Sequence, residues 1–147
     1  MVTSTASIKT ALETRIESVL GLTKLVFIED IAKNPTNATN NRYGVQLTNS
    51  NEDIAGSVTR NLQLRDSFTV KLTNEFVDNQ YSSNLDDIKV ALNDSMKTVY
   101  LDFINTKLNI PSIVIDIQNL SVSFDSTPDD NVLVLVATFD VLYRESV

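Results

Sequence analysis

The chain has 147 residues, of which 42% are hydrophobic, and these values fit one globular domain spanning residues 1–147 and exclude a disordered chain. A formal net charge of −7 argues against tight binding to a nucleic-acid backbone, which needs clustered Lys and Arg side chains. Cysteine and histidine are absent, which excludes disulfides, Ser-His and Cys-His nucleophile pairs and the main zinc ligands.

The first part of the chain predicts a helix, a buried strand and a polar loop. Apolar residues recur at helical spacing over residues 8–20, with Ser7 as a candidate N-cap and Gly21 as a stop signal. Residues 22–29 (LTKLVFIE) are apolar on both faces, which is typical of a strand covered on two sides. The Asn-rich stretch 33–42 is a loop by composition.

Two further strands are predicted next. Residues 43–47 alternate between apolar and polar side chains and predict a half-buried strand, and the polar residues 48–56 predict a loop. In residues 57–73 the apolar side chains share the even positions, with breaks only at Arg60 and Asp66. This shared parity favours one long strand, bent near Asp66, which is long enough to leave the sheet and reach a neighbouring molecule.

A long amphipathic helix is predicted for the second half of the chain. Asn84 is the expected start, with Asp86 and Asp87 in the first turn, where carboxylates interact favourably with the helix dipole. The apolar stripe continues to about residue 109, and Pro111 ends the helix. Because the stripe is continuous, we expect this helix to lie across a sheet.

The last third of the chain predicts a long antiparallel hairpin with arms 113–124 and 132–144 and a polar turn 125–131. The apolar positions of the first arm change from odd to even at residues 118–119, which suggests a bulge or a short turn. Pairing of Val122 with Leu133, and equivalent pairs along the arms, would keep the apolar faces together.

These elements together predict an α+β fold: a mainly antiparallel sheet of about five strands with two helices packed on one face and a long C-terminal β-hairpin. The strands carry more apolar surface than two helices can cover, so either loops or another subunit must cover the rest. Arg60, Arg65 and Arg144 lie on or beside predicted strands, and their side chains are either ion-pair partners across an interface or simply exposed. The predicted oligomer-interface residues are Arg60, Arg65, Val132, Val134, Val136 and Arg144.

Carboxylates are the only remaining candidates for chemistry. Glu52 and Asp53 lie in one predicted loop, and Asp125, Asp129 and Asp130 lie in the hairpin turn. They are either oxygen ligands for Ca²⁺ or Mg²⁺ or the polar residues of solvated turns. We expect the second, and therefore predict no enzyme, no metal and no cofactor. The N-terminal segment lacks a signal-peptide core and no apolar run approaches the about 18 residues of a membrane span, so a cytosolic protein is expected.

The order of elements resembles the tail terminator, or tail completion, proteins of tailed bacteriophages. The segments that carry this resemblance are SIKTALETRIESVLGL, KLVFIED, VTRNLQLRDSFTVKL, NLDDIKVALNDSMKTVYLDFINTKL and the closing FDVLYR. The resemblance covers nearly the whole chain as a pattern of elements, without a signature motif.

The resemblance implies a homo-oligomeric ring, usually a hexamer, that caps the tail tube, stops its polymerisation and provides the surface for head and neck joining. It implies a virion protein assembled in the host cytoplasm, with the tail tube protein and head-neck connector proteins as partners and no membrane. DNA would only pass through the lumen, and the polar loops 33–42 and 48–56 would be candidate docking surfaces. The alternative is a small non-catalytic α+β adaptor or ligand-binding domain with a pocket between the long helix and the sheet.

Overall fold

The computed structural model describes residues 5–24, 42–52, 62–75, 81–111, 113–127 and 132–145. The elements follow in the order α1 (Thr5–Leu20), β1 (Thr23–Lys24), β2 (Arg42–Glu52), β3 (Leu62–Glu75), α2 (Tyr81–Thr106), the short 3-10 helix η5 (Lys107–Asn109), β4 (Val114–Thr127) and β5 (Val132–Glu145). The strands form one sheet in the order β1-β2-β3-β5-β4, antiparallel except for the β1–β2 pair. The predicted α+β class and C-terminal hairpin are confirmed.

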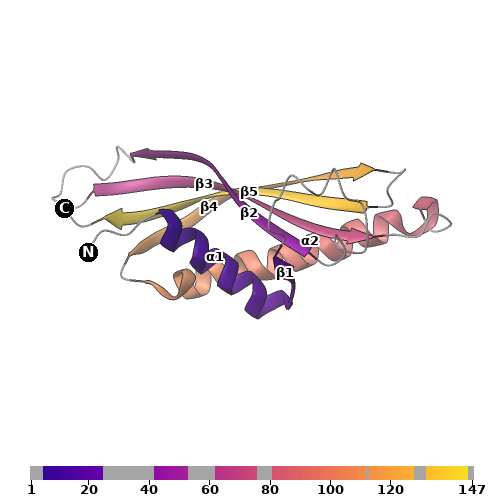
Figure 1. Cartoon of the computed structure of the whole chain (residues 1–147), viewed down its shortest axis with the longest axis horizontal. Coiled ribbons are helices and arrows are strands. Elements are labelled where there is room, and N and C mark those ends of the chain that lie inside the picture. The colour runs from indigo at the N-terminus through magenta and orange to yellow at the C-terminus, as the bar shows by residue number, and fades with distance from the viewer. Residues whose placement is uncertain are drawn as a thin grey trace.

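The sheet is covered by helices on one face only. Figure 1 shows α1 and α2 side by side beneath the strongly twisted sheet, and no helix in the described part of the chain lies on the opposite face. At one end of the molecule the ends of β2 and β5 and the start of β3 extend beyond α1 (Figure 1). We call the helix-covered side of the sheet the core face and the other side the open face.

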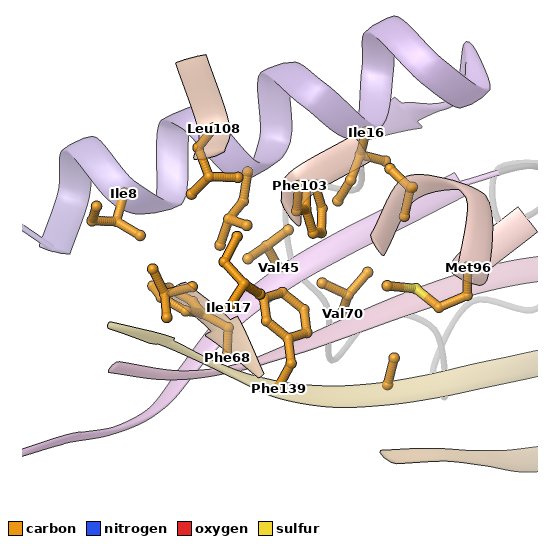
Figure 2. Packing of buried hydrophobic residues seen from close by; sticks show 14 of the residues in the cluster. Ile8, Ile16, Val45, Phe68, Val70, Met96, Phe103, Leu108, Ile117 and Phe139 are labelled. Atoms are coloured by element: carbon orange, nitrogen blue, oxygen red, sulfur yellow. The ribbon is translucent and has the colours of Figure 1, made fainter. Parts of the chain in front are cut away.

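The core lies between the two helices and the core face. The α1 stripe predicted from helical spacing is buried at Ile8, Leu12 and Ile16, none of which has any exposed surface. Side chains of α2 meet the middle of the sheet, where Phe103 packs against Phe139 with ring centroids 5.6 Å apart (Figure 2). Burying a side chain of this size contributes on the order of 2 kcal/mol, so this layer dominates the stability of the domain.

The ends of α1 agree only in part with the sequence prediction. Ser7 lies inside α1, since Thr5 is already helical, and it is therefore not the N-cap. The stop at Gly21 is confirmed: its φ is +67°, and its N–H donates to the Glu17 carbonyl at 2.9 Å. A left-handed residue at this position closes the last turn, and glycine adopts that conformation without the steric cost of a Cβ.

The predicted ends of α2 are wrong at both sides. The helix begins at Tyr81 rather than Asn84, so Asp86 and Asp87 lie beyond its first turn. It ends at Thr106, well before Pro111, because the η5 residues Lys107, Leu108 and Asn109 have left-handed φ values of 48°, 58° and 60°. The left-handed turn points Leu108 into the core, where it is 2% exposed.

The β1–β2 region differs from the predicted strand and loops. The described part of the predicted strand 22–29 forms only Thr23–Lys24, which is exposed, and residues 25–29 lie outside the described residues. Arg42 begins β2, and the rest of the predicted loop 33–42 also lies outside. The predicted loop 48–56 is wrong over residues 48–52, which continue β2 as a polar strand that is exposed at residues 48–51.

The long strand predicted for residues 57–73 is present as β3 from Leu62 onward, and residues 57–61 lie outside the described residues. Its even positions face the core as expected, and Phe68, Val70 and Leu72 are at most 1% exposed. The irregularity expected near Asp66 lies in the partner strand, where the β2 register shifts between Leu47 and Asn49.

The hairpin register differs from the predicted one by four residues. Val122 pairs with Ala137, not with Leu133, whose partner is Ser126. The reason is that β4 continues to Thr127, which shortens the predicted turn. An even shift keeps the same side chains on each face, so the predicted faces hold for residues 120–124 and for β5. They do not hold at the start of β4, where the register also shifts between Val114 and Asp116, and Val114 rather than Ile115 is buried in the core. The predicted bulge is confirmed, because the register shifts between Gln118 and Ser121, with Asn119 at a φ of 66°.

Candidate interaction surface

The open face is built mainly from short polar side chains. Along the central strands the cross-strand pairs on this face include Thr69 with Thr138 and Ser67 with Asp140. On the edge strand β4, Ser121 and Ser123 point to the same side and are exposed. Thr138 is exposed like these serines, whereas Thr69 is only 7% exposed. Short polar side chains provide little apolar surface that would drive burial against another layer.

A hydrogen-bonded network organises the middle of the open face. Asp140 accepts hydrogen bonds from the Arg65 guanidinium at 2.9 Å, from Ser67 Oγ at 2.6 Å and from Asn119 Nδ2 at 3.0 Å. With the Gln118 amide oriented so that its oxygen faces Arg65, that oxygen accepts two further hydrogen bonds at 3.0 Å. The network therefore joins β3, β5 and the bulge of β4.

The same network fixes the charge state of Asp140. Burial alone would raise the pKa of this carboxyl, but the hydrogen bonds from Ser67, Asn119 and Arg65, together with the positive charge of Arg65, lower it. Both members of the ion pair are partly buried, with 29% and 18% of the Arg65 and Asp140 side chains exposed. The pair is thus charged but locally neutral, and it adds no net charge to the open face.

A second carboxylate, Asp66, explains the break in the apolar parity of β3. This carboxylate lies on the core face and has no exposed surface. Thr5 Oγ1 donates to it at 3.0 Å, and Ser50 Oγ donates to its other oxygen. Because Thr5 is the first residue of α1, the carboxylate lies near the positive end of the helix dipole. Asp66 therefore anchors α1 and β2 to β3.

The predicted interface residues lie on the open face but at opposite ends of it. Val134 and Val136 pair with Thr73 and Lys71, whereas Arg65 and Arg144 lie toward the other end of β3 and β5. Val134 is only 7% exposed, although Thr138 on the same face of β5 is exposed.

The other predicted interface residues differ in how far their side chains are exposed to solvent. Val136 is half-buried, Arg144 is exposed, and Arg65 is held in an ion pair within the chain. Val132 begins β5, and Arg60 lies outside the described residues.

Two hollows in the described part of the molecule are small. One of about 160 Å³ lies between the end of α1, α2 and the end of β3, and one of about 120 Å³ lies where η5 meets β4 and Arg144. Pockets for drug-sized ligands usually measure about 300 to 1,000 Å³. The space beneath α2 is instead filled by Met96, Val99 and Phe103, which have no exposed surface.

The sheet edges are the feature that sequence reasoning missed. β4 is an edge strand, and within the described ranges no strand pairs with its outer side. The opposite edge is formed by β1 next to Arg42 and Tyr43 and by β2 itself beyond them. A signal for the first edge exists in the β4 sequence, VIDIQNLSVSFDST, which contains none of the Lys, Arg or Pro residues that usually protect edge strands.

Comparison with known proteins and with known site types adds no assignment. Among the residues that the structure describes, no three acidic side chains are grouped so that they could hold a metal ion. Asp53, Asp129 and Asp130, proposed above as possible oxygen ligands, lie outside those residues. No described helix is both long and apolar enough to cross a membrane. No protein-family model and no curated protein matches this chain.

Proposed function

We propose that this protein is a structural virion protein that forms a homo-oligomeric ring, a hexamer as in the tail terminators it resembles, and caps the tail tube of a bacteriophage. The observation that supports this most is the half-covered sheet: among the described residues, helices lie on one face only, the open face is mainly polar, and no strand pairs with the outer side of β4 or with that of β2 beyond Tyr43. A domain of this kind is complete in its core but not at its edges, which favours assembly with copies of itself.

In the proposed ring the open face lines the lumen and the helices lie outside. DNA passing through a lumen must not be held by clustered cations. On the open face Arg65 is neutralised by Asp140, and the other charges, among them Lys71 and Asp116, are of both signs and lie apart along the strands. This arrangement supports passage rather than binding of DNA.

The partners that follow are the tail tube protein on one side of the ring and head-neck connector proteins on the other. The protein would assemble in the host cytoplasm and remain in the virion, at the tail or neck. No catalytic step is part of this role. The alternative, a ligand-binding adaptor, is less well supported because the space beneath α2 is filled and the described hollows are small.

Native mass spectrometry tests the proposal. The purified chain, at micromolar concentration, is measured alone and after mixing with the tail tube protein of the same virus. The expected result is a discrete multiple of the 16.3 kDa chain mass, and tubes that stop growing when the protein is added. Monomer alone under both conditions, with tubes of unchanged length, would contradict the proposal.

A further inference from the structure

We infer that the outer edge of β4, over residues 120–127, pairs in antiparallel fashion with the outer edge of β2, over residues 46–51, in a second copy of this chain. The inference rests on the proposed ring and names the contact that would build it. It concerns the two edges of the sheet, not the valine patch on β5.

The bulge divides the β4 edge into two parts. At residues 118–121 the register shifts and Asn119 is left-handed, which interrupts regular pairing. Beyond it, from Ser121 to Thr127, β4 pairs with β5 without any break. In a regular antiparallel strand every second residue directs its N–H and C=O away from its existing partner, so this part is a complete template for one more strand.

The side chains of this part of β4 do not protect it. Leu120, Val122 and Phe124 lie on the core face and are only half-buried, although Lys89 lies 5.9 Å from the centre of the Phe124 ring. The alternate residues on the open face are short and uncharged up to Asp125. A half-covered apolar row beside unpaired backbone groups favours the addition of a strand.

Beyond Tyr43, no described strand pairs with the outer side of β2, and this part of β2 has a matching pattern on both sides of the register shift between Leu47 and Asn49. Residues 46–51 (QLTNSN) carry no charge and all are exposed. Leu47, which is 41% exposed, lies on the core face opposite Phe68, whereas Gln46 lies on the open face opposite Thr69. When the two edges meet with their core faces on the same side, apolar side chains meet apolar ones and polar side chains meet polar ones.

Strand direction selects this pair of edges. The pairs β2–β3, β3–β5 and β5–β4 are all antiparallel, so β2 and β4 run in opposite directions within one chain. A second copy in the same orientation therefore places its β2 antiparallel to β4, and the sheet continues across the contact. Because two different edges meet, the contact is heterologous, and repetition about a rotation axis closes a ring, whereas pairing of β4 with β4 would stop at a dimer.

Disulfide cross-linking tests the inference, because the natural chain has no cysteine. Variants with Ser121→Cys or Ser123→Cys are each mixed with variants carrying Gln46→Cys, Asn49→Cys or Asn51→Cys and oxidised. All five positions are exposed and lie on the open face, so the substitutions leave the core intact. The expected result is a covalent dimer in mixtures of a β4 variant with a β2 variant, strongest for one combination because the register is fixed.

Controls separate this contact from others. Thr138→Cys places an equally exposed thiol on the open face of the central strand β5, and it should give no dimer with any variant. Dimers formed by Ser123→Cys alone would show β4–β4 pairing and overturn the inference. A ring mass by native mass spectrometry without any β4–β2 cross-link would overturn it while leaving the proposed function intact, and monomer throughout would overturn both.

Discussion

At the scale of single residues, Asp140 shows why the open face was hard to foresee. In the sequence it is one charged residue on the mixed face of an apolar strand. In the structure it accepts hydrogen bonds from Arg65 and Asn119, which lie 75 and 21 positions away along the chain. The partner of a charged side chain depends on strand order and register, and periodicity within one strand contains neither.

The network makes stability depend on pH through Asp140. Because its pKa in the folded chain is lower than its ordinary value of about 3.9, its ionised form stabilises the fold above that pH. This contribution is lost as the pH falls through the folded-state pKa. Asp140→Asn should cost on the order of 1 to 3 kcal/mol at pH 7 and should weaken the loss of stability on acidification.

Urea unfolding at a series of pH values between 7 and about 3 measures both effects. Asp94→Asn, which replaces an exposed carboxylate of α2, is the matched control and should cost less than about 0.5 kcal/mol at pH 7. An Asp140→Asn chain that loses stability on acidification as steeply as the unmodified protein would contradict the role of the network.

Tyr43 gives a second prediction from titration. Burial raises the pKa of this phenol above its ordinary value of about 10, and the hydrogen bond that it donates to Glu17 at 2.7 Å raises it further. Burial, followed by the charge of Asp116, also raises the pKa of Tyr100. Absorbance titration of the four tyrosines should therefore show a late fraction, and Tyr43→Phe should reduce it without changing the early fraction.

The raised pKa also fixes the direction of the alkaline effect. The neutral phenols contribute stability below the unfolded-state pKa of about 10, and this contribution is lost as the pH rises beyond it. A Tyr43→Phe chain whose late fraction equals that of the unmodified protein would contradict the buried placement.

Val134 and Thr138 form a matched pair on the open face of β5. Val134 is 7% exposed, whereas Thr138 is exposed. Val134→Asp places a carboxylate in a site without a partner, and it should destabilise the monomer by about 3 kcal/mol. Thr138→Asp should change stability by less than about 0.5 kcal/mol, as surface substitutions usually do. Equal small effects in thermal unfolding would show that Val134 is free to serve as a docking residue instead.

At the scale of elements, the existence and type of each long element were predictable, and the ends were not. The α2 stripe indicated a long helix, but the left-handed turn at Lys107, Leu108 and Asn109 carries little sequence signal, since only Asn109 is of a type that favours this conformation. The turn exists because Leu108 is buried in the core. Tertiary packing thus overrides the local preference.

Because of this left-handed turn, replacing Lys97 and replacing Lys107 with glycine should have different effects on stability. Lys97 lies inside α2, so Lys97→Gly should cost about 1 kcal/mol. Lys107 has a φ of 48°, which glycine adopts freely, so Lys107→Gly should leave stability unchanged or raise it by up to about 1 kcal/mol. Urea unfolding of both variants measures the difference, and an equal loss at the two positions would contradict the left-handed turn.

The hairpin shows the limit of hydrophobic patterning. The change of phase at residues 118–119 correctly predicted the bulge, because an inserted residue exchanges the two faces of a strand. The register was wrong by four residues, because Asp125, Ser126 and Thr127 have turn composition yet belong to β4. An even shift preserves both faces, so only the turn geometry decides the register.

At the scale of the whole molecule, the class was predictable and the candidate site was not. Periodicity gives the number of strands, but it does not give their order, and strand order decides which strands are edges. The interface was therefore expected on β5, whose apolar second face suggested a need for cover. The order β3-β5-β4 places β5 inside the sheet, where Val134 is only 7% exposed, and leaves β4 and β2 with unpaired edges among the described residues.

The edges, the polar open face and the one-sided helix layer together support self-assembly through the sheet. Under the proposed function, the two unlike edges of neighbouring copies would meet head to tail, and a ring forms when the rotation between copies closes. We therefore propose that copies of this domain close into a ring.

Negative-stain imaging of the purified chain at micromolar concentration, alone and with tail tube protein, tests that claim most directly. If copies of the domain form the proposed ring, the images should show closed rings of uniform diameter with a central opening, and caps of the same shape at the ends of tubes. Single small particles under both conditions, or open filaments of variable length, would contradict it.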